Sequence, residues 1–319
     1  MTAPKPIARH EFDAAELVAS HPPRLQHPKK KLVFGIACPP GAVHSGRVVF
    51  TRWRCMPLPP AIPEREPVLE AREDVFGYEA PAAGAVEWHL NFADPALFFA
   101  YGTSLLAQDE LQVAEHPALG SLREALVARR IDCSTVEGPE PSPVLVTGVE
   151  RRCRIATRGL YGNAFARASD DAIRRATTAL SPPTITNVVA MAAPSGRSGS
   201  YLRPDVDYVT KTAFTAFEAA RLESGVLDPA HREVAIHTGF WGCGAFGGNR
   251  VLMALLQLVA ARLAGIERVV FHTFDRAGTT ALDTARRHLR ELVSSGRATR
   301  DVLEDVLELN LLWGVSDGN

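Results

Sequence analysis

The sequence has few cysteines, no long hydrophobic run and no excess of charge of either sign. Its five cysteines are odd in number and include no Cys-x-x-Cys pair, which argues against a disulfide framework and against a zinc ribbon. The longest apolar stretch, 251–261, is shorter than the roughly 18 to 20 residues that cross a bilayer. No apolar segment follows a basic start at the N-terminus, so we expect no secretory signal. These absences predict a cytoplasmic protein with no membrane partner.

Charge and histidine spacing exclude two further classes of partner. Lys and Arg total 35 against 36 Asp and Glu, so the net charge of −1 draws the molecule neither to nucleic acid nor to anionic lipid. The basic runs 29–31 and 151–154 are too short for a nucleic-acid footprint, and we expect them to be solvated. The ten histidines include no His-x-x-x-His and no His-Glu-x-x-His. Two lone histidines near strand ends, His237 and His272, are therefore expected in the core or at its rim, with no metal bound.

What the chain does contain is a change of composition along its length. Proline is frequent in residues 1–30 and 57–84, and proline breaks regular elements. We therefore expect residues 1–74 to form a Pro-rich N-terminal extension with a few strands. The core is expected at 75–279, and C-terminal helices packed on that core are expected at 280–319.

Hydrophobic periodicity predicts the elements of an α/β fold. The expected strands are 31–36, 47–50, 86–92, 144–147, 185–191, 233–237 and 269–274. The expected helices are 121–129, 172–179, 208–221, 250–263, 280–293 and 301–311. Strands alternate with helices after residue 140, which implies a sheet with parallel pairs and helices on both faces. Because helix 250–263 is apolar nearly all round, we expect it to lie inside the protein.

A glycine-rich loop lies between strand 233–237 and helix 250–263. Residues 239–248 hold five glycines in ten positions, which is tolerable only where the backbone takes a positive φ or is approached closely. A strand-to-helix loop of this kind presents free N–H groups and the positive end of a helix dipole, which suit a phosphate. Trp241 and Phe246 interrupt the glycines, and aromatic side chains in such a loop often form the wall of a pocket.

Two known phosphate-binding motifs can be compared with this loop. The P-loop pattern is missing, so a P-loop NTPase is excluded. Gly242-x-Gly244-x-x-Gly247 matches the dinucleotide fingerprint in form, but the acid expected about 20 residues further on comes later, at Asp275. Too few residues follow Asp275 to supply the remaining strands of such a domain. The glycine-loop anion site and the dinucleotide fingerprint nevertheless both predict an ADP-like diphosphate as the ligand.

An acid pair, Asp109 and Glu110, follows the strand that ends near Asp94. Adjacent carboxylates on a helix point about 100° apart, so they cannot flank one glycosidic bond as in two-carboxylate hydrolases. A neighbouring like charge and an apolar environment both raise the pKa of a carboxyl, as a proton donor at neutral pH requires. The alternative is a solvated first helical turn whose acids complement the helix dipole.

Together these segments resemble the poly(ADP-ribose) glycohydrolase family, a branch of the macrodomain fold. The loop reads Thr238-Gly-Phe-Trp-Gly-Cys-Gly-Ala-Phe-Gly-Gly-Asn249, where the family has Thr-Gly-Asn-Trp-Gly-Cys-Gly-Ala-Phe-Gly-Gly-Asp. Upstream, Asn91-Phe-Ala-Asp94 is similar to the family's Phe-Ala-Asn strand end, and Gln108-Asp-Glu110 to its Gln-Glu-Glu signature. The similarity extends over about residues 75–275 and implies a macrodomain-like mixed sheet sandwiched by helices.

The resemblance also implies roles for individual residues. Loop 239–247 would bind the diphosphate of ADP-ribose, with Phe246 against the ribose whose C1″ bond is cut. Glu110 would protonate the leaving oxygen and then activate water, while Asp109 and Gln108 would hold ribose hydroxyls. No cofactor and no metal are implied. The implied ligand-binding residues are Asp94, Gln108, Gly239, Phe240, Trp241, Gly242, Cys243, Gly244, Ala245, Phe246 and Gly247.

The chain departs from the family where three consecutive glycines are usual. Residues 95–102 read Pro-Ala-Leu-Phe-Phe-Ala-Tyr-Gly, and we expect their bulky side chains to occupy space near the distal ribose and diphosphate. The leading hypothesis is a glycohydrolase that cleaves a ribosyl bond of ADP-ribose or a related nucleotide, free or attached to a protein or metabolite. The alternatives are a macrodomain module that binds ADP-ribose without cutting it and an N-glycosidic bond hydrolase for an NAD-derived metabolite. Cys243 could serve as a nucleophile, but the resemblance implies that it packs.

Overall fold

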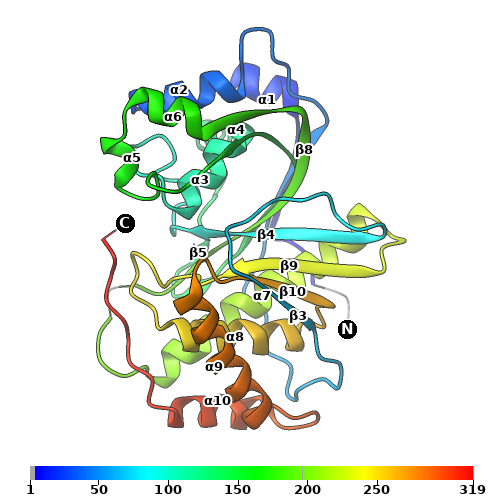
Figure 1. The fold of residues 1–319 in the computed structure, drawn as a ribbon. Coiled ribbons are helices and arrows are strands. Elements are labelled where there is room, and N and C mark those ends of the chain that lie inside the picture. The colour runs from blue at the N-terminus through cyan, green and yellow to red at the C-terminus, as the bar shows by residue number, and fades with distance from the viewer. Residues whose placement is uncertain (1–3, 196, 319) are drawn as a thin grey trace.

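The computed structural model describes residues 4–195 and 197–318 and contains one large mixed sheet (Figure 1). The order of the strands across it is β1-β2-β7-β8-β4-β9-β10-β3. Pairs from β1 to β8 are antiparallel, and pairs from β8 to β3 are parallel. The strands are β1 (Ala8–Asp13), β2 (Arg47–Arg52), β3 (Val68–Arg72), β4 (Ala85–Ala93), β7 (Val144–Ile155), β8 (Thr177–Ala192), β9 (Glu233–Gly239) and β10 (Arg268–His272), with a separate hairpin of β5 (Val136–Glu137) and β6 (Glu140–Pro141).

Helices cover both faces of this sheet. Figure 1 shows α7, α8, α9 and α10 on one side and the helices from α1 to α6 on the other. Those of the first group are α7 (Arg203–Leu227), α8 (Arg250–Leu263), α9 (Arg276–Leu292) and α10 (Thr299–Glu308). The others are α1 (Ala14–Ser20), α2 (Pro28–Ala37), α3 (Gln108–Glu115), α4 (Pro117–Ala128), α5 (Ala164–Arg167) and α6 (Asp170–Ala176). The α/β class and the helix-covered mixed sheet predicted above are confirmed.

The two helical layers enclose separate parts of the core. The larger part packs α7 and α8 on the parallel strands and includes the fully buried Trp88 and Phe271. A second part lies under α1 and α4 on the antiparallel strands, and a third joins α2 to Leu106 and Phe165. Nearly every residue of α8 is buried, as its apolar sequence predicts. The N-cap of α8 is Asn249, whose side chain accepts hydrogen bonds from the N–H groups of Val251 and Leu252.

Most of the expected elements are present, and one is of the wrong type. Expected strands 86–92, 185–191 and 233–237 lie within β4, β8 and β9, and expected helix 250–263 coincides with α8. Residues 31–36, predicted as a strand, belong to helix α2 instead. Pro28 occupies the first turn of that helix, where proline is favoured, and Val33 and Ala37 are buried by packing in the third part of the core.

The N-terminal extension and the C-terminal helices are both joined to the sheet and its layers. Strand β1 pairs with β2, which pairs with β7, so residues before 75 supply one edge of the sheet. Helix α9 packs on α8, and α10 packs on α7. The division of the chain at residues 75 and 280 stays a prediction.

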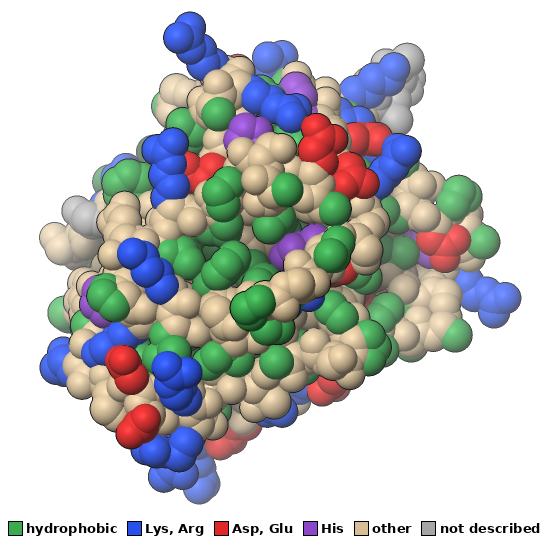
Figure 2. Space-filling model, turned by 90° about the horizontal axis from the view of Figure 1, so that it is seen from above, with side chains coloured by type: hydrophobic (Ala, Val, Ile, Leu, Met, Phe, Trp, Pro, Cys, Tyr) green, Lys and Arg blue, Asp and Glu red, His purple; other side chains and the backbone are tan. Residues whose placement is uncertain are grey.

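The surface carries side chains of both charges, as the near-zero net charge predicts. On the face shown in Figure 2, hydrophobic side chains gather in a central hollow, and lysine and arginine side chains are spread around its edge. Among the described residues, no helix combines the length and the apolarity needed to cross a membrane.

Candidate active site

One cavity brings the acid pair and the glycine loop together. It has a volume of about 690 Å³ and lies between the first turn of α3, the end of β4 and the loop that joins β9 to α8. This volume is in the range of pockets that hold drug-sized ligands. The predicted site residues that line it are Asp94, Gln108, Asp109, Glu110 and every residue from Gly239 to Phe246. Gly247 is not among the lining residues.

The first turn of α3 is fixed to the end of β4 by the side chain of Gln108. The Gln108 amide accepts a hydrogen bond from the N–H of Phe92 at 2.7 Å and donates one to the carbonyl of Leu90 at 2.9 Å. Asp109 accepts a hydrogen bond from the Asn91 side chain at 2.9 Å. Gln108 therefore extends the hydrogen bonding of β4 and sets where the next two residues point.

Both carboxyls of the acid pair are buried. Asp109 is 7% exposed and Glu110 is 4% exposed, so they do not form the solvated first turn considered as an alternative. Burial and the charge of Glu110 raise the pKa of Asp109 to about 7. Burial likewise raises the pKa of Glu110. The Glu110 carboxylate also accepts a hydrogen bond from the backbone N–H of Ala107 at 3.0 Å, which orients it at the start of α3.

The glycine loop offers unused backbone donors to the cavity. The N–H groups of Gly244, Ala245 and Phe246 have no hydrogen-bond partner within residues 4–195 and 197–318. Gly242 and Gly247 take positive φ values of 74° and 67°, a backbone conformation that glycine adopts without strain. Three successive free amides before the N-terminus of a helix can hold an anion such as a phosphate.

The side chains of Phe240, Trp241 and Cys243 pack against the core as well as lining the cavity. Trp241 is fully buried, and its indole N–H donates to the carbonyl of Met191 at 2.9 Å. Phe240 packs edge-on against Phe271, with their ring centroids 5.1 Å apart. Burial raises the pKa of the Cys243 thiol to about 12, so it stays protonated at neutral pH and does not suit a nucleophile.

Residues 95–102 do not fill the cavity as expected. Leu97, Phe98 and Tyr101 are buried in the second part of the core, and Phe99 is 64% exposed. Only Ala100 of this segment lines the cavity. The expectation was wrong because the backbone turns its bulky side chains away, with Phe98 at a positive φ of 54°.

Aromatic side chains from outside the two predicted stretches also line the cavity. Phe76 and Tyr78 come from the segment between β3 and β4, whereas Tyr161 and Phe274 come from loops after β7 and β10. Tyr161 and Phe274 lie 6.1 Å apart between ring centroids. Flat side chains of this kind can stack on a base or a sugar. Sequence reasoning missed them because each stands alone in a loop without a recognisable motif.

The basic residues around the cavity are of two kinds. Arg151 and Arg152 were expected to be solvated, but both are buried, because Arg151 pairs with Glu115 at 2.8 Å and Arg152 with Glu150 at 2.6 Å. Arg151 lines the cavity, and so do the exposed Arg154, Arg158 and Arg250. Exposed guanidinium groups at the rim favour an anionic ligand.

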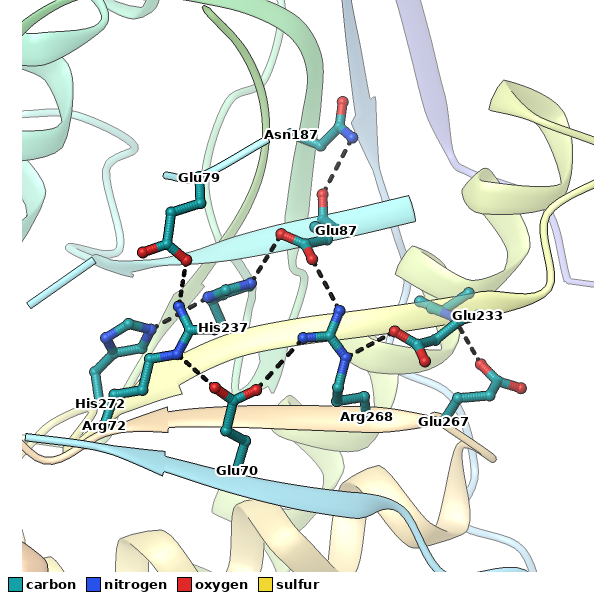
Figure 3. A network of polar contacts seen from close by, with 11 residues as sticks. Glu70, Arg72, Glu79, Glu87, Asn187, Glu233, His237, Glu267, Arg268 and His272 are labelled. Carbon is teal, nitrogen blue, oxygen red and sulfur yellow. Dashed lines mark hydrogen bonds and ion pairs between the residues drawn. The ribbon is translucent and has the colours of Figure 1, made fainter. Parts of the chain in front are cut away.

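A buried histidine cluster lies beside the cavity, where Figure 3 shows His237 between Glu87 and His272. Possible ligand atoms of Glu87, His89 and His237 lie within 4.8 Å of one another. The rings of His89 and His237 stack at 4.2 Å with an angle of 18°, so their in-plane lone pairs do not converge on one ion. Burial lowers the pKa of His272 to about 3 and that of His89 well below its usual value. His89 and His272 are therefore uncharged near neutral pH.

Comparisons with known proteins place the chain in one family. A family model described as poly (ADP-ribose) glycohydrolase (PARG), macro domain fold, matches residues 105–281, which is more than half of the chain.

Solved structures of bacterial PARG are among the similar ones. The PARG of Thermomonospora curvata is 18% identical, with a TM-score of 0.49, and the match covers 82% of this chain and 100% of that one. The PARG of Deinococcus radiodurans, solved in complex with ADP-ribose, is 16% identical, with a TM-score of 0.42 over 89% of this chain and 95% of that one. A macrodomain of Oceanobacillus iheyensis is 10% identical, with a TM-score of 0.40, and the match covers 64% of this chain and 85% of that one. On the family match, the chain belongs to the poly(ADP-ribose) glycohydrolase family of the macrodomain fold.

Proposed function

We propose that this protein hydrolyses the glycosidic bond at C1″ of an ADP-ribosyl ligand, with Glu110 as the acid and base. The observation that carries the proposal is one cavity that is lined both by a buried carboxyl with a raised pKa and by a loop with three free backbone amides. The family is one of glycosidic hydrolases, in keeping with this chemistry. The ligand is ADP-ribose or a related nucleotide, free or attached to a protein or metabolite.

The diphosphate would bind at the glycine loop. Amides of Gly244, Ala245 and Phe246, together with the N-terminus of α8, supply hydrogen-bond donors and a positive potential. Arg250 stands at the same end of the cavity, above the ring of Phe240 at 5.2 Å. Phe246 would contact the ribose, and the other aromatic residues that line the cavity offer faces for the base.

Glu110 would act twice in the reaction. Burial raises the pKa of its carboxyl, which favours the protonated form, and the proton passes to the leaving oxygen as the C1″–O bond breaks. The resulting positive charge on the ribose is stabilised by the nearby carboxylates and the bound diphosphate. The Glu110 carboxylate then takes a proton from water, which attacks C1″ and completes hydrolysis.

Replacing Glu110 by Gln tests this role directly. The amide oxygen of the new side chain can still accept the hydrogen bond from the N–H of Ala107, but the amide does not donate a proton to the leaving oxygen. We expect Glu110→Gln to lower turnover of ADP-ribosyl substrates by about 100-fold or more. Calorimetry should show that it binds ADP-ribose with an affinity within about threefold of the original protein.

A matched control separates this effect from a general change of charge. Glu137→Gln, in the exposed hairpin of β5 and β6, removes the same charge outside the cavity and should leave turnover unchanged. Full turnover by Glu110→Gln would disprove the assigned role. If the original protein binds ADP-ribose but turns over neither poly(ADP-ribose) nor mono-ADP-ribosyl substrates, the protein is a binding module instead.

A further inference from the structure

A buried lysine outside the matched part of the chain lies next to the acid pair. Lys30 belongs to the first turn of α2 and is 2% exposed, although its basic run was expected to be solvated. Its ammonium has no hydrogen-bond partner in the part of the chain that the structure describes. Lys30 lies well before residue 105, where the family match begins. An unpaired buried ammonium is costly, so its position calls for an explanation.

The packing of α2 directs this side chain toward the start of α3. The Lys30 ammonium lies over the ring of Phe165, 5.6 Å from its centroid. Lys30 also lines a small cavity together with Ala114, which is one helical turn after Glu110 and therefore on the same face of α3. Phe165 packs with Leu106, the residue two before α3 begins. These contacts place the ammonium beside the helical turn that carries both acids.

Charge explains why the ammonium is tolerated there. The negative charges of Glu110 and Asp109 favour protonated Lys30, against the larger effect of burial, and its pKa falls only to about 8. In return, Lys30 is the largest influence that lowers the pKa of Glu110 against burial. Asp94 also acts on both acids in the opposite direction, and Tyr161 lies near Glu110. Among these neighbours, only Lys30 carries a positive charge.

We propose that Lys30 is a positioning residue that supplies the counter-charge of the Asp109–Glu110 pair and so sets how many protons the pair holds near neutral pH. Without a counter-charge, burial favours the protonated form of both carboxyls, and the resting pair then lacks a carboxylate that can stabilise positive charge on the ribose. The ammonium favours ionisation of the pair, so that one carboxyl can carry a negative charge while the other keeps a transferable proton. This inference adds a residue to the proposed function and partly rests on it.

The test replaces Lys30 by Met, which is apolar and unbranched like the lysine stem. Because burial opposes the charge on Lys30, Lys30→Met removes a buried charge and we expect it to fold. The carboxyl titrations of Asp109 and Glu110, followed by ¹³C NMR of the ligand-free protein, should move upward by about one pH unit or more. The pH optimum of turnover should move in the same direction, so that activity lost at pH 7 returns at higher pH.

The matched control is Lys31→Met, which removes the same charge from the next, exposed residue of α2. It should leave both titrations and the pH optimum unchanged. Carboxyl titrations that stay within about 0.2 pH unit in Lys30→Met would overturn the inference. Because these titrations need no substrate, they answer this question even if no ADP-ribosyl substrate is turned over, which would count against the proposed function alone.

A second measurement does not depend on the folding of a Lys30 variant. Interaction between two charges is reciprocal, so removing one charge changes the pKa of the other. In Glu110→Gln, the titration of the Lys30 ammonium, followed by ¹⁵N NMR, should move downward by about half a pH unit or more. An unchanged Lys30 titration in this variant would also overturn the inference.

Discussion

At the scale of single residues, Asp109 lines the candidate site, and its burial lowers the stability of the fold where its carboxyl is charged. Its pKa is about 7 in the folded protein, against an ordinary value of 3.8. The folded state therefore binds the proton more tightly than the unfolded state, and stability falls as the pH rises from about 4 to about 7. Above that range the buried carboxylate is charged and its full cost applies.

We expect Asp109→Asn to be more stable than the original protein at pH 8, by on the order of 3 kcal/mol. The gain should disappear near pH 4, where the aspartate is neutral in both states. The amide oxygen of the new side chain can still accept the hydrogen bond from Asn91. Urea denaturation at the two pH values measures the difference.

The control for this prediction is Asp283→Asn on the exposed surface of α9, where the Asp283 side chain is 64% exposed. It should change the free energy of unfolding by less than about 0.5 kcal/mol at either pH. Equal stability of Asp109→Asn and the original protein at pH 8 would show that Asp109 is not charged within the fold.

Sequence reasoning was uneven at this scale. It singled out Asp109 and Glu110 because an adjacent acid pair is visible in a short stretch of sequence, and the structure buries both. It expected Lys30 to be solvated, since three consecutive lysines usually are. The burial of Lys30 depends on Phe165 and on α3, which are far away in the sequence. A pattern confined to neighbouring residues carries no information about such contacts.

At the scale of elements, the loop between β9 and α8 depends on the backbone of Gly242. Its φ is +74°, and a Cβ there would lie 2.5 Å from the Cβ of Ala193 and 3.2 Å from the Met253 side chain. We expect Gly242→Ala to lower the free energy of unfolding by about 2–4 kcal/mol and to weaken ADP-ribose binding, because the loop must move. Urea denaturation and calorimetry measure the two effects.

Gly159→Ala separates backbone strain from steric conflict. Gly159 has a nearly identical φ of +75°, but no atom lies within 4 Å of the position of its Cβ. The free energy of unfolding of Gly159→Ala should fall by only about 1 kcal/mol, and its ligand affinity should not change. Equal losses in the two variants would mean that crowding around Gly242 is unimportant.

Element types were predicted best where one pattern dominated. Helix α8 was predicted with its observed bounds because a long apolar run follows the Asn249 cap. The segment 31–36 has β-branched and aromatic residues and was mistaken for a strand, since its helix is stabilised by tertiary packing of α2. The expected helix 172–179 also ends early, at Ala176, because β8 begins at Thr177.

At the scale of the whole molecule, the first elements of the chain complete structures built by later ones. All six residues of β1 pair with β2, and Arg9 in β1 forms an ion pair with Glu223 of α7 at 2.9 Å. Helix α2 supplies Val33 and Ala37 to the third part of the core. Cores that are shared in this way unfold together.

We therefore expect a single transition in scanning calorimetry of the full chain. Deletion of residues 1–37 should abolish this transition, because it removes α2 and exposes Val48 and Phe50 of β2. A truncated protein with an unchanged melting midpoint would contradict this expectation and would support an independent core from about residue 75. Two transitions in the calorimetric scan of the full chain would also contradict this expectation.

The site as a whole could be predicted only in part from the sequence. The resemblance to a family suggested that the acid pair and the glycine loop share a ligand, and both line one cavity. The wall formed by Phe76 and Tyr78 was not predicted, because no motif marks the segment between β3 and β4. The path of residues 95–102 was also missed, since a side-chain direction follows from backbone geometry that composition does not reveal.

The strand order has a practical consequence for anyone who wishes to excise the catalytic part of this protein. Similarity to the family begins at residue 105, yet β4, between β8 and β9 near the middle of the sheet, ends at Ala93, and β3 comes earlier still. A fragment cut at the limits of that similarity would split the sheet between two parallel neighbours. Boundaries for expression should follow the strands rather than the alignment.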